Sequence, residues 1–258
     1  MFMYAQLPLP TIFAHRGASA HAPENTRVAF QLGLHQGADA IELDTKLSAD
    51  GIVVVIHDAT VDRTTDGSGA VKKLSLQALK ELDAGIFFDL AFRGERIPTL
   101  EEVFDVVGKQ TFINIELTNY TTPNDALPEK VADLVINNNL QDRVLFSSFN
   151  PRILHWIHRL LPSAPIGLLA FSGGTGALTR SWLGYALCRY QALHSDSSDV
   201  TPRLVERLHR FGQRIHAFTV NHPKEMHRLF TLDVDGIFTD DPALARQVLS
   251  RTNLKAKQ

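Results

Sequence analysis

Residues 40–57 read AIELDTKLSADGIVVVIH, and this stretch decides the fold. Polar and apolar side chains alternate along residues 40–47, and residues 52–57 form a second apolar run, so both segments are predicted strands. Only residues 48–51 separate them, which is too short a connection for the crossover that a parallel neighbour requires. The two segments are therefore predicted to form an antiparallel hairpin that turns at Asp50-Gly51.

Eight strand candidates, residues 40–47 among them, remain when residues 52–57 are set aside as the return arm of this hairpin. Helical patterns separate most of them, and the length of 258 residues is close to the ~250 residues typical of an eightfold barrel. The sequence thus predicts an α/β fold, a (β/α)₈ TIM barrel in a single domain over residues 1–258, with active residues at the C-terminal strand ends. The candidate strands are 12–14, 40–47, 112–117, 144–149, 165–170, 192–196, 214–220 and 236–239, and the helical segments are 99–107, 128–138, 151–160, 201–210 and 223–230.

Residues 58–95 do not belong to this repeat. They contain a turn-rich segment at residues 65–69 and a short helical pattern that Ser75 can cap. The barrel pattern resumes at Thr99, which is predicted to form a capping box with Glu102. We expect residues 58–95 to be a small insertion after the second strand, lying over the barrel mouth.

Composition and charge limit the classes of function. The net charge of -2 gives no electrostatic basis for binding nucleic acid or an anionic membrane. The single cysteine, Cys188, excludes an internal disulfide, and we expect it to be a buried small apolar residue. No stretch approaches the ~20 apolar residues of a membrane span, and no Lys or Arg of a secretory signal precedes Arg16. These features predict a cytoplasmic protein without stable membrane insertion, and they leave the oligomeric state open.

Three acidic residues are candidate metal ligands. Side chains alternate along a strand, so Glu42 and Asp44 point to one face of residues 40–47, and Glu116 points to the inward face of residues 112–117. Carboxylates on one face repel each other unless a cation lies between them, and oxygen ligands favour Mg²⁺ or Ca²⁺ over Zn²⁺. The alternative is that these acids are solvated strand ends or are paired with Arg and Lys.

Two histidines are candidates for acid–base catalysis. His15 and His57 both lie at predicted strand ends, and an imidazole titrates near neutral pH. A structural role is the alternative for each of them. Arg16 follows His15 and can bind phosphate oxygens with its planar guanidinium group, although pairing with Glu42 or Glu24 is an alternative role for it.

Short motifs follow one another along nearly the whole chain. They are His15-Arg16-Gly17, Pro23-Glu24-Asn25-Thr26, Glu42-Leu43-Asp44, His57-Asp58, Thr65-Asp66-Gly67-Ser68-Gly69, Ile97-Pro98-Thr99-Leu100, Glu116, Ser147-Ser148-Phe149, Thr219-Val220-Asn221 and Asp235-Gly236-Ile237-Phe238-Thr239-Asp240. This ordered set strongly resembles the glycerophosphodiester phosphodiesterase family. Each motif alone is weak evidence, whereas their common order is specific.

The resemblance implies an enzyme that splits glycerophosphodiesters into glycerol 3-phosphate and an alcohol. Its partner is then a small-molecule phosphodiester, and its cofactor is a divalent cation, Mg²⁺ or Ca²⁺, held by the three acidic residues. We assign His15 as the base that deprotonates the nucleophile and His57 as the acid that protonates the leaving alkoxide. Arg16 and the cation would stabilise the charge on the phosphoryl oxygens.

Other residues are expected near the barrel mouth. Glu24 and Asn25 would position groups there, although Asn25 could equally be the N-cap of the following helix. Aromatic side chains could form the walls of the substrate pocket, with ordinary packing as the alternative for each. These aromatic residues are Phe149, Phe171, Trp182 and Phe218.

Two positions depart from the pattern of the family. Phe218 stands where the family usually has a tryptophan, and Thr118 stands where it usually has a lysine, two residues after the strand glutamate. The second change removes a cation from beside the phosphate. Lys46 could supply this charge, because it continues the inward face of Glu42 and Asp44. The alternative is that Lys46 lies in solvent beyond the end of the strand.

Three other functions compete with this prediction. A related phosphodiesterase could act on lysophospholipids. A non-hydrolytic barrel lyase or isomerase, such as an aldolase, could use the same carboxylates, but it would normally need a Schiff-base lysine or an enolate-directed base, and neither stands out. A phosphate-binding module without enzymatic activity would not need both histidines.

Overall fold

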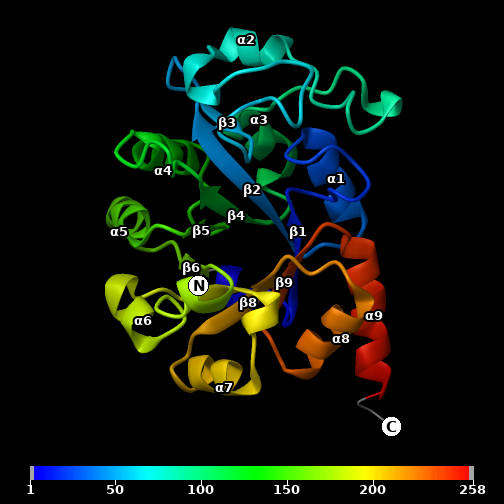
Figure 1. The fold of residues 1–258 in the computed structure, drawn as a ribbon, viewed down its shortest axis with the longest axis vertical. Coiled ribbons are helices and arrows are strands. Elements are labelled where there is room, and N and C mark those ends of the chain that lie inside the picture. The colour runs from blue at the N-terminus through cyan, green and yellow to red at the C-terminus, as the bar shows by residue number, and fades with distance from the viewer. Residues whose placement is uncertain (1–2, 256–258) are drawn as a thin grey trace.

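The computed structural model describes residues 3–255, and it confirms the predicted (β/α)₈ barrel. Within these residues eight parallel strands form a closed ring, because the last strand, β9, pairs with the first, β1. Figure 1 shows the strands surrounded by helices. The parallel strands are, in the order of the ring, β1 (Thr11–His15), β2 (Ala40–Leu47), β4 (Phe112–Leu117), β5 (Val144–Ser148), β6 (Ile166–Ala170), β7 (Ala192–Asp196), β8 (Arg214–Phe218) and β9 (Gly236–Thr239).

The predicted hairpin is confirmed. Strand β3 (Val53–Val55) runs antiparallel to β2 and lies outside the ring of parallel strands. The backbone N–H of Ser48 donates to the carbonyl of Ile52 at 3.0 Å, which closes the turn. Gly51 has a φ of +74°, in the left-handed region that glycine adopts without steric cost. The short connection thus turns the chain back along β2 and leads it away from the barrel.

The helices form the outer layer of the barrel (Figure 1). The helix predicted over residues 99–107 begins with the expected capping box between Thr99 and Glu102, but it widens into a π-helical turn at Phe104–Gly108. Helices α6 and α9 were not among the predicted segments. The helices are α1 (Arg27–His35), α3 (Leu100–Val103), α4 (Leu127–Asn137), α5 (Pro151–Leu160), α6 (Trp182–Cys188), α7 (Pro202–Arg210), α8 (Pro223–Thr231) and α9 (Pro242–Lys255).

The inside of the barrel is filled with side chains at the N-terminal ends of the strands. A short helical turn at Met3–Gln6 brings Tyr4 against Phe112, with ring centroids 5.8 Å apart. The guanidinium group of Arg214 lies over the Tyr4 ring at 4.3 Å. These contacts close the lower end of the barrel. The other buried apolar residues of this layer are Leu7, Phe13, Ala40, Leu145, Ala192 and Phe238.

The segment after β3 has a small apolar core of its own. Its helix α2 (Leu76–Glu81) is capped by Ser75, as predicted. Figure 1 places most of this segment beside the ring of helices, next to α3, whereas we had expected it over the barrel mouth. Its apolar side chains pack with β3 and so hold it at the side of the barrel. This cluster contains Val54, Ile56, Val61, Val71, Leu79, Ala84 and Ile97.

Three further expectations concern the termini, the cysteine and the membrane. The basic residues of positions 254–258 predict a frayed C-terminal tail; residues 256–258 lie outside the described residues, whereas Lys255 belongs to α9. Cys188 is buried, as expected. Between residues 3 and 255, no helix combines the length and the apolar character that a bilayer crossing needs.

Candidate active site

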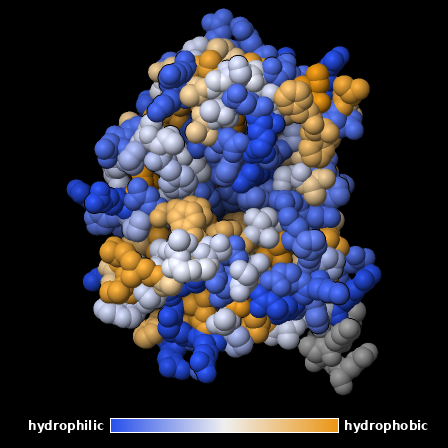
Figure 2. Space-filling model, viewed as in Figure 1, coloured by the Kyte–Doolittle hydropathy of each residue, from blue (hydrophilic) through white to orange (hydrophobic). Residues whose placement is uncertain are grey.

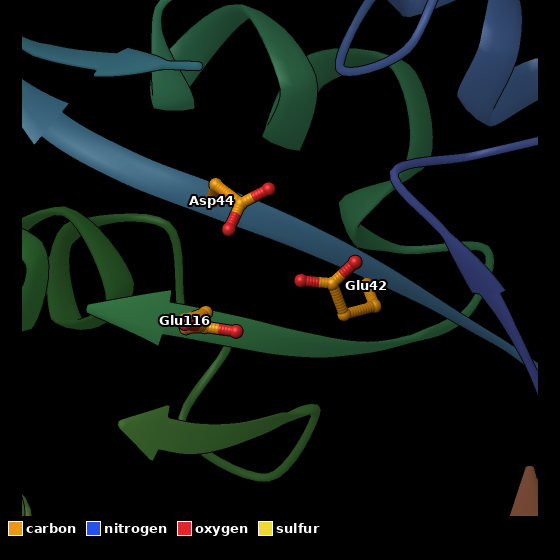
Figure 3. A group of neighbouring side chains, drawn as sticks. All are labelled: Glu42, Asp44 and Glu116. Carbon is orange, nitrogen blue, oxygen red and sulfur yellow. The ribbon is translucent and has the colours of Figure 1, made fainter. Parts of the chain in front are cut away.

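Glu42 and Asp44 on β2 and Glu116 on β4 converge at the C-terminal end of the barrel (Figure 3). The two strands are neighbours, and their register places Asp44 beside Glu116. One carboxylate oxygen from each residue lies within 4.8 Å of the other two. Glu42 and Asp44 are almost fully buried, with exposures of 3% and 1%, and Glu116 is partly buried. The predicted common inward face of the three acids is therefore correct.

The electrostatics of this triad fit a site that binds a cation. Burial, followed by repulsion from Asp44, raises the pKa of Glu116 from its ordinary value of 4.5 to about 8. The same causes, with a contribution from Glu116, raise the pKa of Glu42 well above its usual range. Burial in a low dielectric and a neighbouring like charge both disfavour the ionised carboxylate. A divalent ion with oxygen ligands would remove this penalty, so the residues present fit Mg²⁺ or Ca²⁺.

The loop after β1 holds two of these carboxylates in place. The backbone N–H of Arg16 donates to Oε2 of Glu42 at 2.9 Å, and Nδ2 of Asn25 donates to Oδ2 of Asp44 at 2.9 Å. Arg16 and Asn25 have φ angles of 55° and 58°, a left-handed conformation that is strained for side chains other than glycine. The N-cap of α1 is Thr26, so the alternative role of Asn25 as the N-cap is wrong. Asn25 instead positions a carboxylate.

The Arg16 side chain lies between the triad and Glu24. Its Nη1 donates to Oε1 of Glu24 at 2.9 Å, and its Nε lies 3.3 Å from Oδ2 of Asp44. Glu24 also accepts two hydrogen bonds from Arg63, each 2.8 Å long. The pairing of Arg16 with Glu24 that the sequence left open is thus present. The guanidinium group nevertheless lines the central cavity.

His15 is held by a carboxylate from the other end of the chain. Its Nδ1 lies 2.7 Å from Oδ1 of Asp240, which follows β9. Asp240 also accepts hydrogen bonds from Oγ of Ser19 at 2.9 Å and from Nδ2 of Asn221 at 2.5 Å. Burial raises the pKa of Asp240, but the hydrogen bond and the charge of His15 outweigh it, so that the pKa lies below its usual value. The contact at Nδ1 leaves Nε2 of His15 for chemistry in the cavity.

His57 has a similar partner. Its Nδ1 lies 2.6 Å from Oδ1 of Asp58, and Oδ2 of Asp58 accepts a hydrogen bond of 2.7 Å from Nε of Arg63. The hydrogen bond from Arg63, together with the one to His57, lowers the pKa of Asp58 to about 2. Asp58 therefore stays ionised at neutral pH and orients His57. Through Arg63 and Glu24, the same chain of contacts reaches Arg16.

Sequence reasoning assigned no role to several residues that position this site. Asp58 and Asp240 lie inside quoted motifs, so the motifs themselves carried the signal for them. Arg63 and Tyr120 lie in loops without a local pattern. The hydroxyl of Tyr120 donates to Oε1 of Glu116 at 2.7 Å and accepts from the backbone N–H of Phe149 at 3.2 Å. Tyr120 thereby links a triad carboxylate to the wall of the cavity.

Glu42, Glu116, His15 and His57 line a common cavity of about 220 Å³ at the C-terminal end of the barrel. Figure 2 shows this face of the molecule, hollowed near its centre. Phe149 and Phe218 line the cavity, and Phe171 stacks on Phe149 with ring centroids 4.1 Å apart. Trp182 belongs to the outer helix α6 and is 71% exposed, so the structure does not place it in this wall. The residues that complete the lining are His15, Arg16, Glu42, His57, Asn114, Glu116, Ser147, Leu169, His194, Thr219 and Phe238.

Lys46 contacts the residue that replaces the lysine of the family. Its Nζ donates to the carbonyl oxygen and to Oγ1 of Thr118, at 2.7 and 2.8 Å. Burial lowers the pKa of Lys46, although Asp44 and Glu116 act in the opposite direction. Lys46 is therefore not a solvated residue beyond the strand. Lys46 and Thr118 line a neighbouring hollow of about 130 Å³ rather than the central cavity.

A closed parallel barrel that carries an acidic triad and two carboxylate-paired histidines at its C-terminal strand ends defines a class of α/β-barrel enzymes suited to metal-assisted phosphoester chemistry. Comparison with known proteins narrows this class. The model of the glycerophosphoryl diester phosphodiesterase family matches residues 15–244. The chain belongs to this family.

Relatives and solved structures agree with this assignment. The chain is 42% identical to a glycerophosphodiester phosphodiesterase of Caldanaerobacter subterraneus subsp. tengcongensis, over 90% of this chain and 94% of that protein. It is 38% identical to the enzyme of the same name from Bacillus altitudinis, over 92% of this chain and 97% of that one. An Oleispira antarctica phosphodiesterase, solved in complex with the product sn-glycerol-3-phosphate, matches with a TM-score of 0.84 and 31% identity, over 96% of this chain and 98% of that one.

Proposed function

We propose that this protein hydrolyses glycerophosphodiesters to glycerol 3-phosphate and an alcohol, with the help of a divalent cation. The observation that carries the proposal is the carboxylate triad, two members of which line one cavity with two carboxylate-paired histidines. The names of the relatives and the product bound to the Oleispira antarctica enzyme support the same reaction.

The cation would be Mg²⁺ or Ca²⁺, held by Glu42, Asp44 and Glu116. When bound, it supplies positive charge that neutralises the phosphoryl oxygens. Arg16 lies at the edge of the triad and would bind the phosphate with the same effect. Its present partner Glu24 is shared with Arg63, so the guanidinium group of Arg16 can turn to a phosphate while Glu24 keeps a cationic partner.

The two histidines would carry the proton transfers. Nε2 of His15 would take a proton from the nucleophile, which is water or a substrate hydroxyl, while Asp240 holds the ring and stabilises its charged form. The oxygen of the nucleophile bonds to phosphorus as the bond between phosphorus and the oxygen of the alcohol breaks. Where the nucleophile is a substrate hydroxyl, water then opens the cyclic phosphate to glycerol 3-phosphate. His57, oriented by Asp58, would give a proton to the leaving alkoxide. Each histidine would thus have one fixed nitrogen and one reacting nitrogen.

We also propose that residues 1–258 act as one domain. The insertion at residues 58–95 contributes Asp58 and Arg63 to the rim of the cavity, so it serves the site although most of it lies beside the barrel. Removing it would leave His57 without its partner.

A direct assay tests the reaction. The purified protein is freed of metal and incubated with glycerophosphocholine or glycerophosphoethanolamine, with and without added Mg²⁺ or Ca²⁺. We expect glycerol 3-phosphate to form only with added metal. Failure to release it from either substrate with either metal would reject the proposed function.

A further inference from the structure

The floor of the central cavity is polar, at a depth where barrel interiors usually hold apolar side chains. Asn114 lies two residues before Glu116 on β4, on the same inward face, and is 1% exposed. Its Nδ2 donates to Oγ of Ser147 on β5 at 2.9 Å. His194 on β7 completes the floor, and neither Ser147 nor His194 is exposed at all. The proposed reaction assigns no role to these three residues.

Two polar atoms of this floor lack partners. Oδ1 of Asn114 and Nδ1 of His194 are buried and make no hydrogen bond to any residue that the structure describes. Leaving a buried polar group unpaired costs about 1–3 kcal/mol, so both atoms favour a ligand that can bond to them. Oδ1 of Asn114 can only accept a hydrogen bond, whereas Oγ of Ser147 can also donate one.

His194 is a neutral hydrogen-bonding group. Burial lowers its pKa to about 3, so the ring carries no charge at neutral pH. Its Nε2 lies 3.2 Å from Nδ1 of His216, and one of these two nitrogens donates to the other. Depending on which ring donates, Nδ1 of His194 carries a proton or a lone pair. The floor can therefore match a partner that both donates and accepts.

The floor has room for a small ligand, and the layer of rings below it prevents the ligand from going deeper into the barrel. A methyl group on Gly167 of β6 would lie only 2.5 Å from Nε2 of His194, so the imidazole takes the space that a side chain at this position would fill. Below it, the rings of Phe238 and His216 lie 4.9 and 5.1 Å from the ring of His194. A ligand that enters from the mouth ends at this layer.

We propose that Asn114, Ser147 and His194 bind the hydroxyl end of the glycerol moiety, while the alcohol that is released extends toward the open mouth. This inference rests on the proposed function. A hydroxyl group both donates and accepts, as the floor requires, whereas an ammonium head group cannot accept a hydrogen bond and a carboxylate cannot donate one. The floor lies next to Glu116, so a phosphate at the triad brings its short substituent within reach.

An enclosed glycerol moiety has consequences for substrate choice. A fatty acyl chain on the same glycerol would have to enter the closed floor, so lysophospholipids should be poor substrates. With the metal-loaded native enzyme, we expect lysophosphatidylcholine below its micelle concentration to be hydrolysed at least tenfold more slowly than glycerophosphocholine. Equal rates at equal concentrations would contradict the orientation proposed here.

Equilibrium binding tests the floor without turnover. By calorimetry in the presence of Mg²⁺, native protein should bind sn-glycerol 3-phosphate about tenfold or more tightly than n-propyl phosphate, which has the same carbon chain without hydroxyl groups. Asn114→Leu and His194→Leu should each reduce this ratio about fivefold, the typical effect of one hydrogen bond. The control His155→Ala, at an exposed residue of the outer helix α5, should leave the ratio unchanged.

The outcomes separate this inference from the proposed function. If native protein binds the two phosphates with equal affinity, or binds neither, the proposed binding of glycerol by the floor is wrong. The same conclusion would follow if the variants lost affinity for both phosphates equally, because the substituted residues would then have only a structural role. If Asn114→Leu or His194→Leu does not fold, as judged by its thermal transition, the ratio of affinities is measured on Ser147→Ala instead, and it should be reduced there too. If the protein discriminates between the two phosphates but does not hydrolyse glycerophosphocholine, the proposed function is wrong and the binding of glycerol by the floor is retained.

Discussion

At the scale of single residues, His15 and His57 differ in how far away in the sequence their carboxylate partners lie. Asp58 is the next residue after His57, whereas Asp240 lies 225 positions from His15. Both carboxylates contact Nδ1, so the two rings present the same nitrogen to the cavity. The geometry alone is therefore symmetric, and kinetics must separate the acid from the base.

Leaving-group ability distinguishes the two histidines. If His57 is the general acid, His57→Ala should lose far more activity on an alkyl leaving group than on a nitrophenol, which departs without a proton. Steady-state rates on glycerophosphocholine and on a nitrophenyl phosphodiester measure this difference. Losses of equal size on both substrates would reject the role of His57, and a selective loss in His15→Ala would exchange the two assignments. His155→Ala, on the outer helix α5, serves as the control.

Lys46 is expected to compensate for the lysine that Thr118 replaces. Compensation requires Nζ of Lys46 to turn from Thr118 to the phosphate. Lys46→Met should then cost about 1.5–3 kcal/mol, the contribution of a hydrogen bond to a charged group, or about ten- to a hundredfold in kcat/KM. Thr118→Lys should recover much of this loss in the double variant. Lys72→Met, at an exposed lysine of the same hollow, is the matched control. A change within about twofold in Lys46→Met would mean that Arg16 and the cation suffice.

At the scale of elements, the triad joins the neighbouring strands β2 and β4. Chelation should abolish turnover, and Glu42→Gln or Asp44→Asn should weaken metal binding without unfolding the chain, because the strands are paired through their backbones. Calorimetric titration with Mg²⁺ and Ca²⁺, together with circular dichroism, measures both effects. Full activity in excess EDTA, with no metal found by elemental analysis, would exclude this role.

The triad also predicts how the stability of the metal-free protein depends on pH. The pKa of Glu116 rises from 4.5 to about 8 on folding, so folding binds a proton between these values. The stabilisation is present below pH 4.5 and is lost as the pH rises toward 8. The melting temperature of chelated protein should therefore fall between pH 5 and pH 8 more steeply than that of Glu116→Gln. Asp58 does not interfere, because its pKa is lowered to about 2 and its effect is lost only in stronger acid.

Added metal reverses the expected loss. A cation that binds the ionised carboxylates favours the folded state, so Mg²⁺ or Ca²⁺ should restore much of the melting temperature at pH 8. The same addition should change Glu116→Gln much less. If the melting temperatures of native protein and Glu116→Gln change equally with pH and with added metal, Glu116 does not titrate in this way.

Local rules explain which elements could be predicted from the sequence. The β2–β3 hairpin follows from the short connection at Asp50-Gly51, and the inward face of Glu42 and Asp44 follows from the alternation of a strand. Helix α6 has an exposed surface that includes Trp182 and Leu187, so it lacks a clear amphipathic pattern. The role of Tyr120 depends on a loop conformation that no local rule specifies.

At the scale of the whole molecule, the barrel topology followed from the alternation of strand and helix patterns, and most of the candidate site followed from the motifs at the strand ends. The position of the insertion did not, because it depends on packing between its own apolar residues and β3. The bonds of Arg63 to Asp58 and Glu24 depend on the same packing. Contacts between segments that are distant in sequence are set by the assembled fold and leave no periodic signal in either segment.

The pairing of β9 with β1 has a consequence for the time at which the site forms during synthesis. The residues of the acidic triad all lie before residue 117, so the ribosome makes them before strands β5 to β9. Asp240, the partner of His15, follows the last strand of the ring, and β1 lacks the second of its two neighbours until β9 has left the ribosome. A nascent chain therefore carries its metal ligands long before it can complete the histidine that we assign as the base. Catalysis would begin only after the ring of strands has closed.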